Sequence, residues 1–472
     1  DAAYETQVLD ARARTHARLA EVLTARGAEP ALIAEHFDRA GRPAEAAALY
    51  LVAGQSEQAR GAHTEAARLF TRTIELLDQL PPSEDRDLQE LMARMMRGLS
   101  VSSTQGYAAP EVQDDHRRAE VLAAGLDTRL EVLPSLIAIW AYWLTSGDLG
   151  SARGLVERLA NLVARPEFAW FEPEVESCAG WLDFYRGELG SARRHLERAV
   201  DGFHRRPADE IVSPFWPLPN DPLAVSYIAL ACVSAVQGDL ADADRWQALA
   251  IRRAEEIGFP RGPFSLAFVK TYAAWIKRFL GDHEKARLLG AEIVGIGQSY
   301  GYAYWMLLGS SYVAAGRPGG APEREFLTQT IASIRLLGQE AFVASNLSYL
   351  AVIARQEGRV ADARDIVDEA LEVVHKTSEC LHLPELLRHR ALYSLELGAD
   401  PVEVLSDLRE ALEESRRQGA MVAHLRAALA IARLPDEHRP AEWRRWLETA
   451  RAGVAGPTVE VREADEILAE AQ

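Results

Sequence analysis

Hydrophobic residues recur three and four positions apart along most of this chain of 472 residues. This is the spacing of one face of an α-helix. The stretch Pro222–Gln237, for example, is followed by a glycine and then by a second stretch of the same kind, Ala241–Ile257. Strictly alternating apolar and polar runs, which would indicate strands, are not needed anywhere. The pattern therefore predicts an all-α fold of paired amphipathic helices.

A glycine followed five positions later by an alanine recurs between these helical stretches. The eight pairs are Gly41/Ala46, Gly61/Ala66, Gly147/Ala152, Gly187/Ala192, Gly238/Ala243, Gly281/Ala286, Gly316/Ala321 and Gly358/Ala363. A further small residue precedes most of these glycines by seven positions, as at Gly54, Gly180 and Gly309. A glycine that ends a helix in the left-handed conformation, between small residues, lets two antiparallel helices cross closely. Repeated along a chain, this pattern predicts a right-handed α-solenoid of helix pairs.

Two irregular segments divide the predicted array. Residues 205–222 contain five prolines, which are excluded from helix interiors and indicate an inserted loop. Ser102–Pro110 separates the first hairpins from those that follow. We therefore expect N-terminal hairpins in 1–101, a main repeat array in 102–400 that carries the loop 205–222, and C-terminal repeats with a capping helix in 401–472. Because the first residue is Asp1 rather than Met, we expect a piece of a longer protein.

Composition narrows the function classes. The formal net charge is −18, with acidic residues spread along helix faces, whereas nucleic-acid binding needs a basic face. No apolar run reaches the roughly 18 residues of a membrane span. Cys178, Cys232 and Cys380 are far apart and odd in number, which argues against a disulfide framework and favours a reducing compartment. We expect a cytoplasmic protein with no nucleic-acid and no membrane partner.

Motifs that would indicate catalysis are missing from the sequence. It contains no Gly-x4-Gly-Lys-Ser/Thr loop to cradle phosphates, no His-Glu-x-x-His and no Gly-x-Ser-x-Gly. His375, Cys380, His382 and His389 form the tightest His/Cys group, but their spacing suits neither a zinc finger nor one helix face. We therefore expect no enzyme, no cofactor and no bound metal, and no nucleotide binding by this chain alone.

Several strings resemble one family of bacterial proteins. The glycine and small-residue columns match the tetratricopeptide repeat, widened to about 40 residues. Ala34–Gly41 and Thr64–Phe70 resemble the segment that follows the ATPase module in signal-transduction ATPases with numerous domains. Thr104–Val112, Pro263–Phe268 and Arg462–Glu470 resemble the repeat region that accompanies class III adenylate/guanylate cyclases in such proteins. LuxR-type and maltose-activator-like regulators are related. The resemblance implies a regulatory or sensor arm that binds an effector or a partner.

Tetratricopeptide repeats usually line their concave groove with residues 10, 6 and 3 positions before the turn glycine. Ser348 and Val352 fall in these columns, and the groove-binding candidates are Ser177, Trp181, Phe184, Thr271, Trp275, Arg278, Met306 and Arg355. Tryptophan and arginine on one concave face are typical of interface hot spots. The same tryptophans could instead fill space between long helices, and the pattern leaves both interpretations open.

The proline-rich loop carries two bulky residues, Phe215 and Trp216. They could close over the groove as a lid or dock on adjacent helices, because large apolar side chains rarely stay in water. The main hypothesis is a non-catalytic regulatory solenoid that binds a protein or peptide segment, which could belong to another domain of the parent chain. The alternative is a sensor of a small-molecule effector that controls an attached ATPase, cyclase or transcription-regulator output. A second copy of the chain also stays open as a partner.

Overall fold

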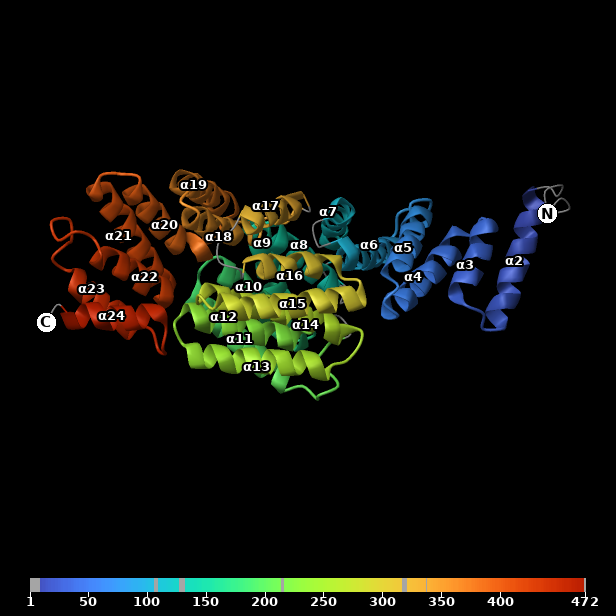
Figure 1. Cartoon of the computed structure of the whole chain (residues 1–472). Coiled ribbons are helices and arrows are strands. Elements are labelled where there is room, and N and C mark those ends of the chain that lie inside the picture. Colours follow the sequence, from blue (N-terminus) through green and yellow to red (C-terminus); the bar gives the residue numbers. More distant parts are fainter. Residues whose placement is uncertain are drawn as a thin grey trace. The chain divides into compact units, whose positions relative to one another are not determined.

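The computed structural model of the chain describes residues 9–105, 109–126, 132–213, 216–315, 321–336 and 338–470. The all-α prediction is confirmed, because the described residues form α-helices and two 3₁₀ turns without a strand (Figure 1). One isolated β-bridge joins Asp239 to Ala455. Consecutive helices pack in pairs joined by short turns, which makes the fold a tetratricopeptide-like α-solenoid. Across these same ranges, no helix combines the length and the apolar content needed to span a bilayer.

The chain forms two compact units, residues 1–142 and 143–472, with the division inside helix α8. The first unit contains α2 (Leu9–Ala25), α3 (Pro30–Arg39), α4 (Pro43–Ala59), α5 (His63–Leu77), α6 (Glu84–Gln105), α7 (Pro110–Ala124) and most of α8 (Val132–Ser146). The three-part division at 101/102 and 400/401 that the sequence suggested stays a prediction.

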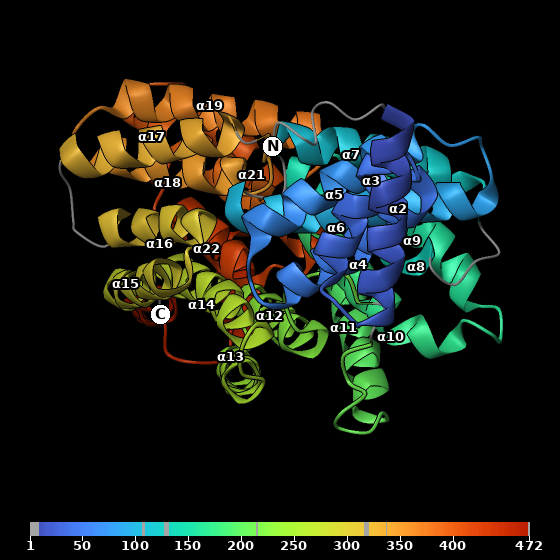
Figure 2. The same ribbon diagram turned by 90° about the vertical axis from the view of Figure 1, so that its right-hand side faces the viewer.

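The second unit holds the remaining hairpins. They are α9 (Leu149–Val163), η1 (Ala169–Phe171), α10 (Glu172–Tyr185), α11 (Leu189–His204), α12 (Pro222–Val236), α13 (Leu240–Glu256), α14 (Arg261–Phe279), α15 (His283–Tyr300), α16 (Ala303–Ala315), α17 (Ala321–Leu336), α18 (Val343–Gln356), α19 (Val360–Thr377), η2 (Cys380–His382), α20 (Leu383–Glu396), α21 (Pro401–Gln418), α22 (Met421–Ala432), α23 (Trp443–Ala452) and α24 (Val459–Glu470). In Figure 2, α10, α12, α14 and α16 follow one another along a curve, each packed on the next.

The turns form as the glycine pattern predicts. Seven of the eight glycines have a positive φ, namely Gly41, Gly61, Gly147, Gly187, Gly238, Gly281 and Gly358, whereas Gly316 lies outside the described residues. In three turns the glycine is followed by an aspartate whose side chain accepts a hydrogen bond from the backbone N–H three residues on: Asp148, Asp239 and Asp282. The Gly-Asp pair therefore ends one helix and caps the next.

Small residues let the two helices of a hairpin touch. An added Cβ at Gly180 of α10 would lie 2.5 Å from Leu196 of α11. The backbones of α15 and α16 also approach closely, because a Cβ at Gly290 would lie 2.7 Å from the carbonyl oxygen of Gly309, and one at Gly309 would lie 2.8 Å from that of Gly290. Neither position can carry a side chain without moving the partner backbone.

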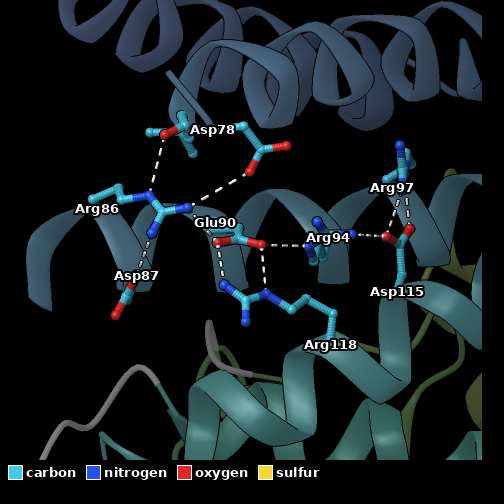
Figure 3. A network of polar contacts seen from close by, with 9 residues as sticks. Asp78, Arg86, Asp87, Glu90, Arg94, Arg97, Asp115 and Arg118 are labelled. Carbon is cyan, nitrogen blue, oxygen red and sulfur yellow. Dashed lines mark hydrogen bonds and ion pairs between the residues drawn. The ribbon is translucent and has the colours of Figure 1, made fainter. Parts of the chain in front are cut away.

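Buried ion pairs join α6 to α7 in the first unit (Figure 3). Glu90 of α6 is fully buried and accepts hydrogen bonds from Arg94 at 2.8 Å and from Arg118 of α7 at 2.9 Å. Asp115 of α7 is equally buried and accepts from the Nε of Arg97 at 2.8 Å. Each carboxylate thus has several guanidinium partners, which is the condition under which burying its charge is tolerated.

The second unit is wound so tightly that early and late turns meet. A Cβ on Gly147 would lie 2.8 Å from Glu340, and one on Gly187 would lie 2.8 Å from Gln418. The N–H of Ala455 donates to the carbonyl oxygen of Gly238 at 2.9 Å. Turns separated by several hairpins are therefore in direct contact, and this winding controls how much of the inner face stays open.

Replacing Gly290 by alanine should lower the free energy of unfolding by about 1–3 kcal/mol, because the added methyl overpacks a backbone contact. Gly295 lies on the same helix, and a Cβ there meets nothing within 4 Å. Gly295→Ala should therefore be neutral or stabilise by up to about 1 kcal/mol through helix propensity. Urea unfolding measures both. Equal effects would show that α15 and α16 do not cross this closely.

Candidate functional site

Aromatic side chains of α10 and α14 fill the inner face of the second unit. The rings of Trp181 and Tyr272 lie 4.7 Å apart, and the hydroxyls of Tyr185 and Tyr272 are hydrogen-bonded at 2.9 Å. Phe184 meets Trp275 edge to face at 5.8 Å. Trp181 is 3% exposed and Phe184 is 1% exposed. Their contacts are those of packed core residues.

The other predicted groove residues lie in several environments. Ser177 and Thr271 are buried, and Ser177 accepts a hydrogen bond from Ser226 at 2.9 Å. Met306 is half-buried over Gly297 at the α15–α16 contact. Arg355 is exposed on α18 and pairs with a glutamate of α20. Whether any of these side chains binds a partner stays a prediction.

The proline-rich loop is anchored to the helices beside it. Trp216 is buried, and its indole N–H donates to the carbonyl oxygen of Asn220 at 2.8 Å. Arg261 of α14 donates to the carbonyl oxygens of Leu218 and Asn220. Trp216 is thus docked in the loop and does not line the pocket described next, whereas Phe215 lies outside the described residues. The lid stays a prediction.

Trp275 and Arg278 line a pocket of about 200 Å³ between α14, α18, α20 and α22, which we call the Arg278 pocket. Its lining consists of Trp275, Arg278, Phe279, Gly281, His283, Ser345, Ser348, Tyr349, Val352, His382, Glu385, Arg388, His389 and Arg426. On α14, α18 and α20 the lining residues recur three or four positions apart, so each of these helices lines the pocket with one of its faces. Ser348 and Val352 belong to the sequence columns predicted to line the groove.

Arg278 is buried without a carboxylate partner among the described residues. It is 7% exposed. Its guanidinium carbon lies 4.8 Å from the ring centre of Tyr312 and 4.7 Å from that of Tyr349. Its N–H groups reach Asn346 Oδ1 and Ser345 Oγ only at 3.4 Å, which makes both hydrogen bonds long. Cation–π contacts therefore hold this charge where an ion pair would be usual.

The other two arginines of the pocket are paired. Arg388 donates to Glu385 at 2.7 Å, and Arg426 donates to Glu460 at 2.7 Å and lies 3.6 Å from Glu385. Burial opposes ionisation of Glu385, but the fields of Arg388 and Arg426 prevail and lower its pKa to about 2. Glu385 is therefore a carboxylate at neutral pH, already committed to two guanidinium groups.

The pocket histidines are neutral. Burial, reinforced by Arg278, lowers the pKa of His382 to about 4, and burial together with Arg388 lowers that of His389 to about 3. An N–H of Arg388 faces His389 Nε2 at 2.7 Å, so that nitrogen must accept. Three buried polar atoms of the pocket lack a hydrogen-bond partner among the described residues: His382 Nε2, Arg388 Nε and Glu385 Oε1. The pocket therefore has two nitrogen atoms and one carboxylate oxygen that the described part of the chain does not satisfy.

Sequence reasoning missed Arg388 and Arg426 as site residues. Gly398 has a φ of 87° and ends α20 as the other turn glycines end their helices. Residue 403 is glutamate rather than alanine, so the glycine–alanine pattern skipped this turn. Counting back 10 positions from Gly398 gives Arg388. His382 and His389, grouped with Cys380 by sequence, both line the pocket. Over the described ranges, no cluster of His, Cys, Asp and Glu is suited to hold a metal ion.

Comparison with known proteins gives distant similarities. No family model matches the chain. It is 21% identical over 407 residues to an uncharacterized protein of Rhizobium meliloti (strain 1021), covering 85% of this chain but 39% of that protein. A Rap protein in complex with competence and sporulation factor matches with a TM-score of 0.45 and 12% identity over 91% of this chain and 99% of that one. A signal transduction ATPase with numerous domains and a tetratricopeptide repeat sensor, from Pyrococcus horikoshii, matches with a TM-score of 0.37 and 12% identity over 90% of this chain and 69% of that one.

Trp181→Ala should lower the free energy of unfolding by about 3–5 kcal/mol, because it leaves a cavity among packed rings. Trp170 is 39% exposed, so Trp170→Ala is a control of the same chemistry that should cost much less. Chemical denaturation of both variants measures the difference. A small effect of Trp181→Ala would mean that this ring stands on an open surface.

Glu379 precedes the 3₁₀ turn that carries His382. Burial raises its pKa to about 8, and the backbone of Phe342 offsets this only in part. Between the ordinary glutamate range and pH 8 the unfolded chain therefore binds fewer protons at this site than the folded chain, and the stability due to Glu379 falls as pH rises.

Glu379→Gln should remove this fall in the free energy of unfolding with rising pH, because glutamine does not ionise. Relative to the natural chain, the variant should gain on the order of 1–3 kcal/mol in free energy of unfolding between pH 5.5 and pH 8. Glu372→Gln, at an exposed position of α19, should leave the pH dependence unchanged. Parallel pH profiles for the natural chain and Glu379→Gln would contradict the assignment.

Proposed function

We propose that this chain is a non-catalytic regulatory or sensor solenoid of a bacterial signal-transduction protein, and that it binds a protein segment through the Arg278 pocket. The observation that carries the proposal is a pocket on stacked helices in which buried polar atoms, among them His382 Nε2 and Arg388 Nε, have no hydrogen-bond partner in the described part of the chain. Buried polar atoms are normally satisfied, so such atoms facing a pocket favour a ligand.

The size of the pocket favours a side chain over a whole small molecule. Sites for drug-sized ligands usually measure about 300–1,000 Å³, whereas this pocket measures about 200 Å³. Its rim includes the exposed residues Gly281 and His283 and the half-buried residues Ser348 and Val352. A segment lying across this rim could insert one side chain between Trp275 and Arg278, as an anchor residue does at a hot spot.

The chain spans 39% of the length of the Rhizobium meliloti protein that it matches. We propose that it serves as an arm of a longer cytoplasmic protein, and that binding biases an attached ATPase, cyclase or transcription-regulator output. A small-molecule effector is the second candidate, favoured by the depth of the pocket, where Trp275 is only 3% exposed.

Filling the pocket should abolish binding. Short random peptides can be selected on the full chain and the best one titrated by calorimetry. Val352→Phe adds bulk to a half-buried lining residue and removes no polar contact, so it should weaken the selected peptide by about 30-fold or more, which is about 2 kcal/mol.

Gln356→Phe is the matched control, because the same side chain is then placed at an exposed position of the same helix. Its peptide affinity should equal that of the natural chain. If Val352→Phe binds as the natural chain does, the peptide lies elsewhere. If no peptide is selected, the protein-segment hypothesis fails.

A further inference from the structure

Arg278 has no carboxylate partner among the described residues, and this indicates which chemical group the pocket binds. Resting on the proposed function, we infer that the anchoring group of the bound segment is a single carboxylate, which pairs with Arg278. The other charges of the pocket are already matched, and Arg278 is the exception. The inference follows from this local charge imbalance together with the way in which the protein holds the arginine.

The protein fixes Arg278 without neutralising it. Arg278 is buried, yet within the described ranges no carboxylate lies in ion-pair distance of its guanidinium. The rings of Tyr312 and Tyr349 hold the guanidinium carbon, and the hydroxyl of Tyr349 is itself fixed by His283 Nδ1 at 2.7 Å. The long 3.4 Å contacts to Ser345 and Asn346 are weak enough to yield to a charged acceptor. A planar guanidinium matches a carboxylate with two parallel hydrogen bonds.

The charge balance favours one negative charge over two. Glu385 and Glu460 offset Arg388 and Arg426, so the groups that line or support the pocket leave one positive charge, that of Arg278. His382 and His389 add none, because both are neutral at physiological pH. A dianion such as a phosphate would carry one charge too many and would meet the Glu385 carboxylate. One carboxylate neutralises the pocket.

The remaining polar atoms can complete such a site. Arg388 Nε is a buried donor without a partner, and His382 Nε2 can donate when the neutral ring carries its proton there. Trp275 and Phe279 supply apolar walls, with their rings stacked 5.4 Å apart. These walls suit the methylene groups of a glutamate or aspartate side chain.

The test titrates the full chain by calorimetry with the α-amide of N-acetyl-L-glutamate, which carries one carboxylate, with the uncharged α-amide of N-acetyl-L-glutamine, and with inorganic phosphate. We expect saturable binding of the glutamate derivative, at least about tenfold weaker binding of the neutral glutamine derivative, and no preference for phosphate. Arg278→Gln should lose the glutamate binding by the same factor or more. Arg433→Gln is the control, since Arg433 is exposed directly after α22 and pairs with Glu463.

A second measurement needs no ligand. Arg278→Met keeps the bulk of the side chain and removes a charge that has no partner, so the melting temperature of the free chain should stay level or rise. Arg426→Met removes the partner of Glu460 and should lower it clearly. A clear fall for Arg278→Met would mean that Arg278 is structural, which would overturn the inference.

The outcomes separate the two proposals. Peptides selected on the chain without enrichment of acidic residues, and unaffected by Arg278→Gln, would overturn the carboxylate inference and leave the protein-segment proposal standing. Binding of the α-amide of N-acetyl-L-glutamate with no peptide selected would support the carboxylate and overturn the protein segment in favour of a small effector. Equal binding of all three probes, or of none, would overturn the carboxylate inference.

Discussion

Two helices can approach as closely as α15 and α16 only where neither carries a side chain at the crossing. Gly290 and Gly309 meet this condition reciprocally, because a Cβ on either would lie within 3 Å of the other's carbonyl oxygen. Gly180 meets half of this condition in another hairpin, where an added Cβ would lie 2.5 Å from the side chain of Leu196. The left-handed glycine turns supply the second half of the constraint, since they reverse the chain at once and keep the paired helices in register. Close crossings and short turns keep the two helices of a hairpin near each other. Successive hairpins of the second unit can then stack along a curve.

The curvature of the second unit decides where a ligand can bind. Early and late turns of this unit touch, as at the contact between Gly187 and Gln418. The inner face near α10 and α14 is therefore closed, and aromatic rings fill it. The inner face stays accessible where α14, α18, α20 and α22 meet, and there the lining is polar. Aromatic rings can be packed away from water, whereas arginine and histidine side chains carry polar groups that need a hydrogen-bond partner or water. The composition of each region thus matches its openness.

The sequence predicted the local features well because they depend on neighbouring residues. A turn glycine, its small companions and the following aspartate act within one hairpin, so the helix pairs and turns such as that at Gly238 could be assigned without a structure. The groove mapping could not decide between packing and recognition for Trp181, which the structure buries, because the openness of a groove depends on the angles between hairpins far apart in the chain. Trp275 and Arg278, from the same mapping, line the Arg278 pocket, and their role in binding stays a prediction. Arg388 was within reach of the same mapping and was missed because Glu403 stands where the pattern expected an alanine.

The charge of the whole chain and that of the pocket have opposite signs, and this affects how an acidic ligand is recognised. A net charge of −18 repels an anion at long range, so electrostatic steering cannot bring it in. Screening at physiological salt limits this repulsion to about 8 Å. Within that range the desolvated guanidinium of Arg278 dominates, because interactions between charges strengthen as water is excluded. An acidic group is therefore held by the short-range pair alone, and only a ligand that also fits between Trp275 and Arg278 comes close enough to form it. This arrangement favours selectivity by shape over rapid capture, which suits a module that reports the presence of one partner.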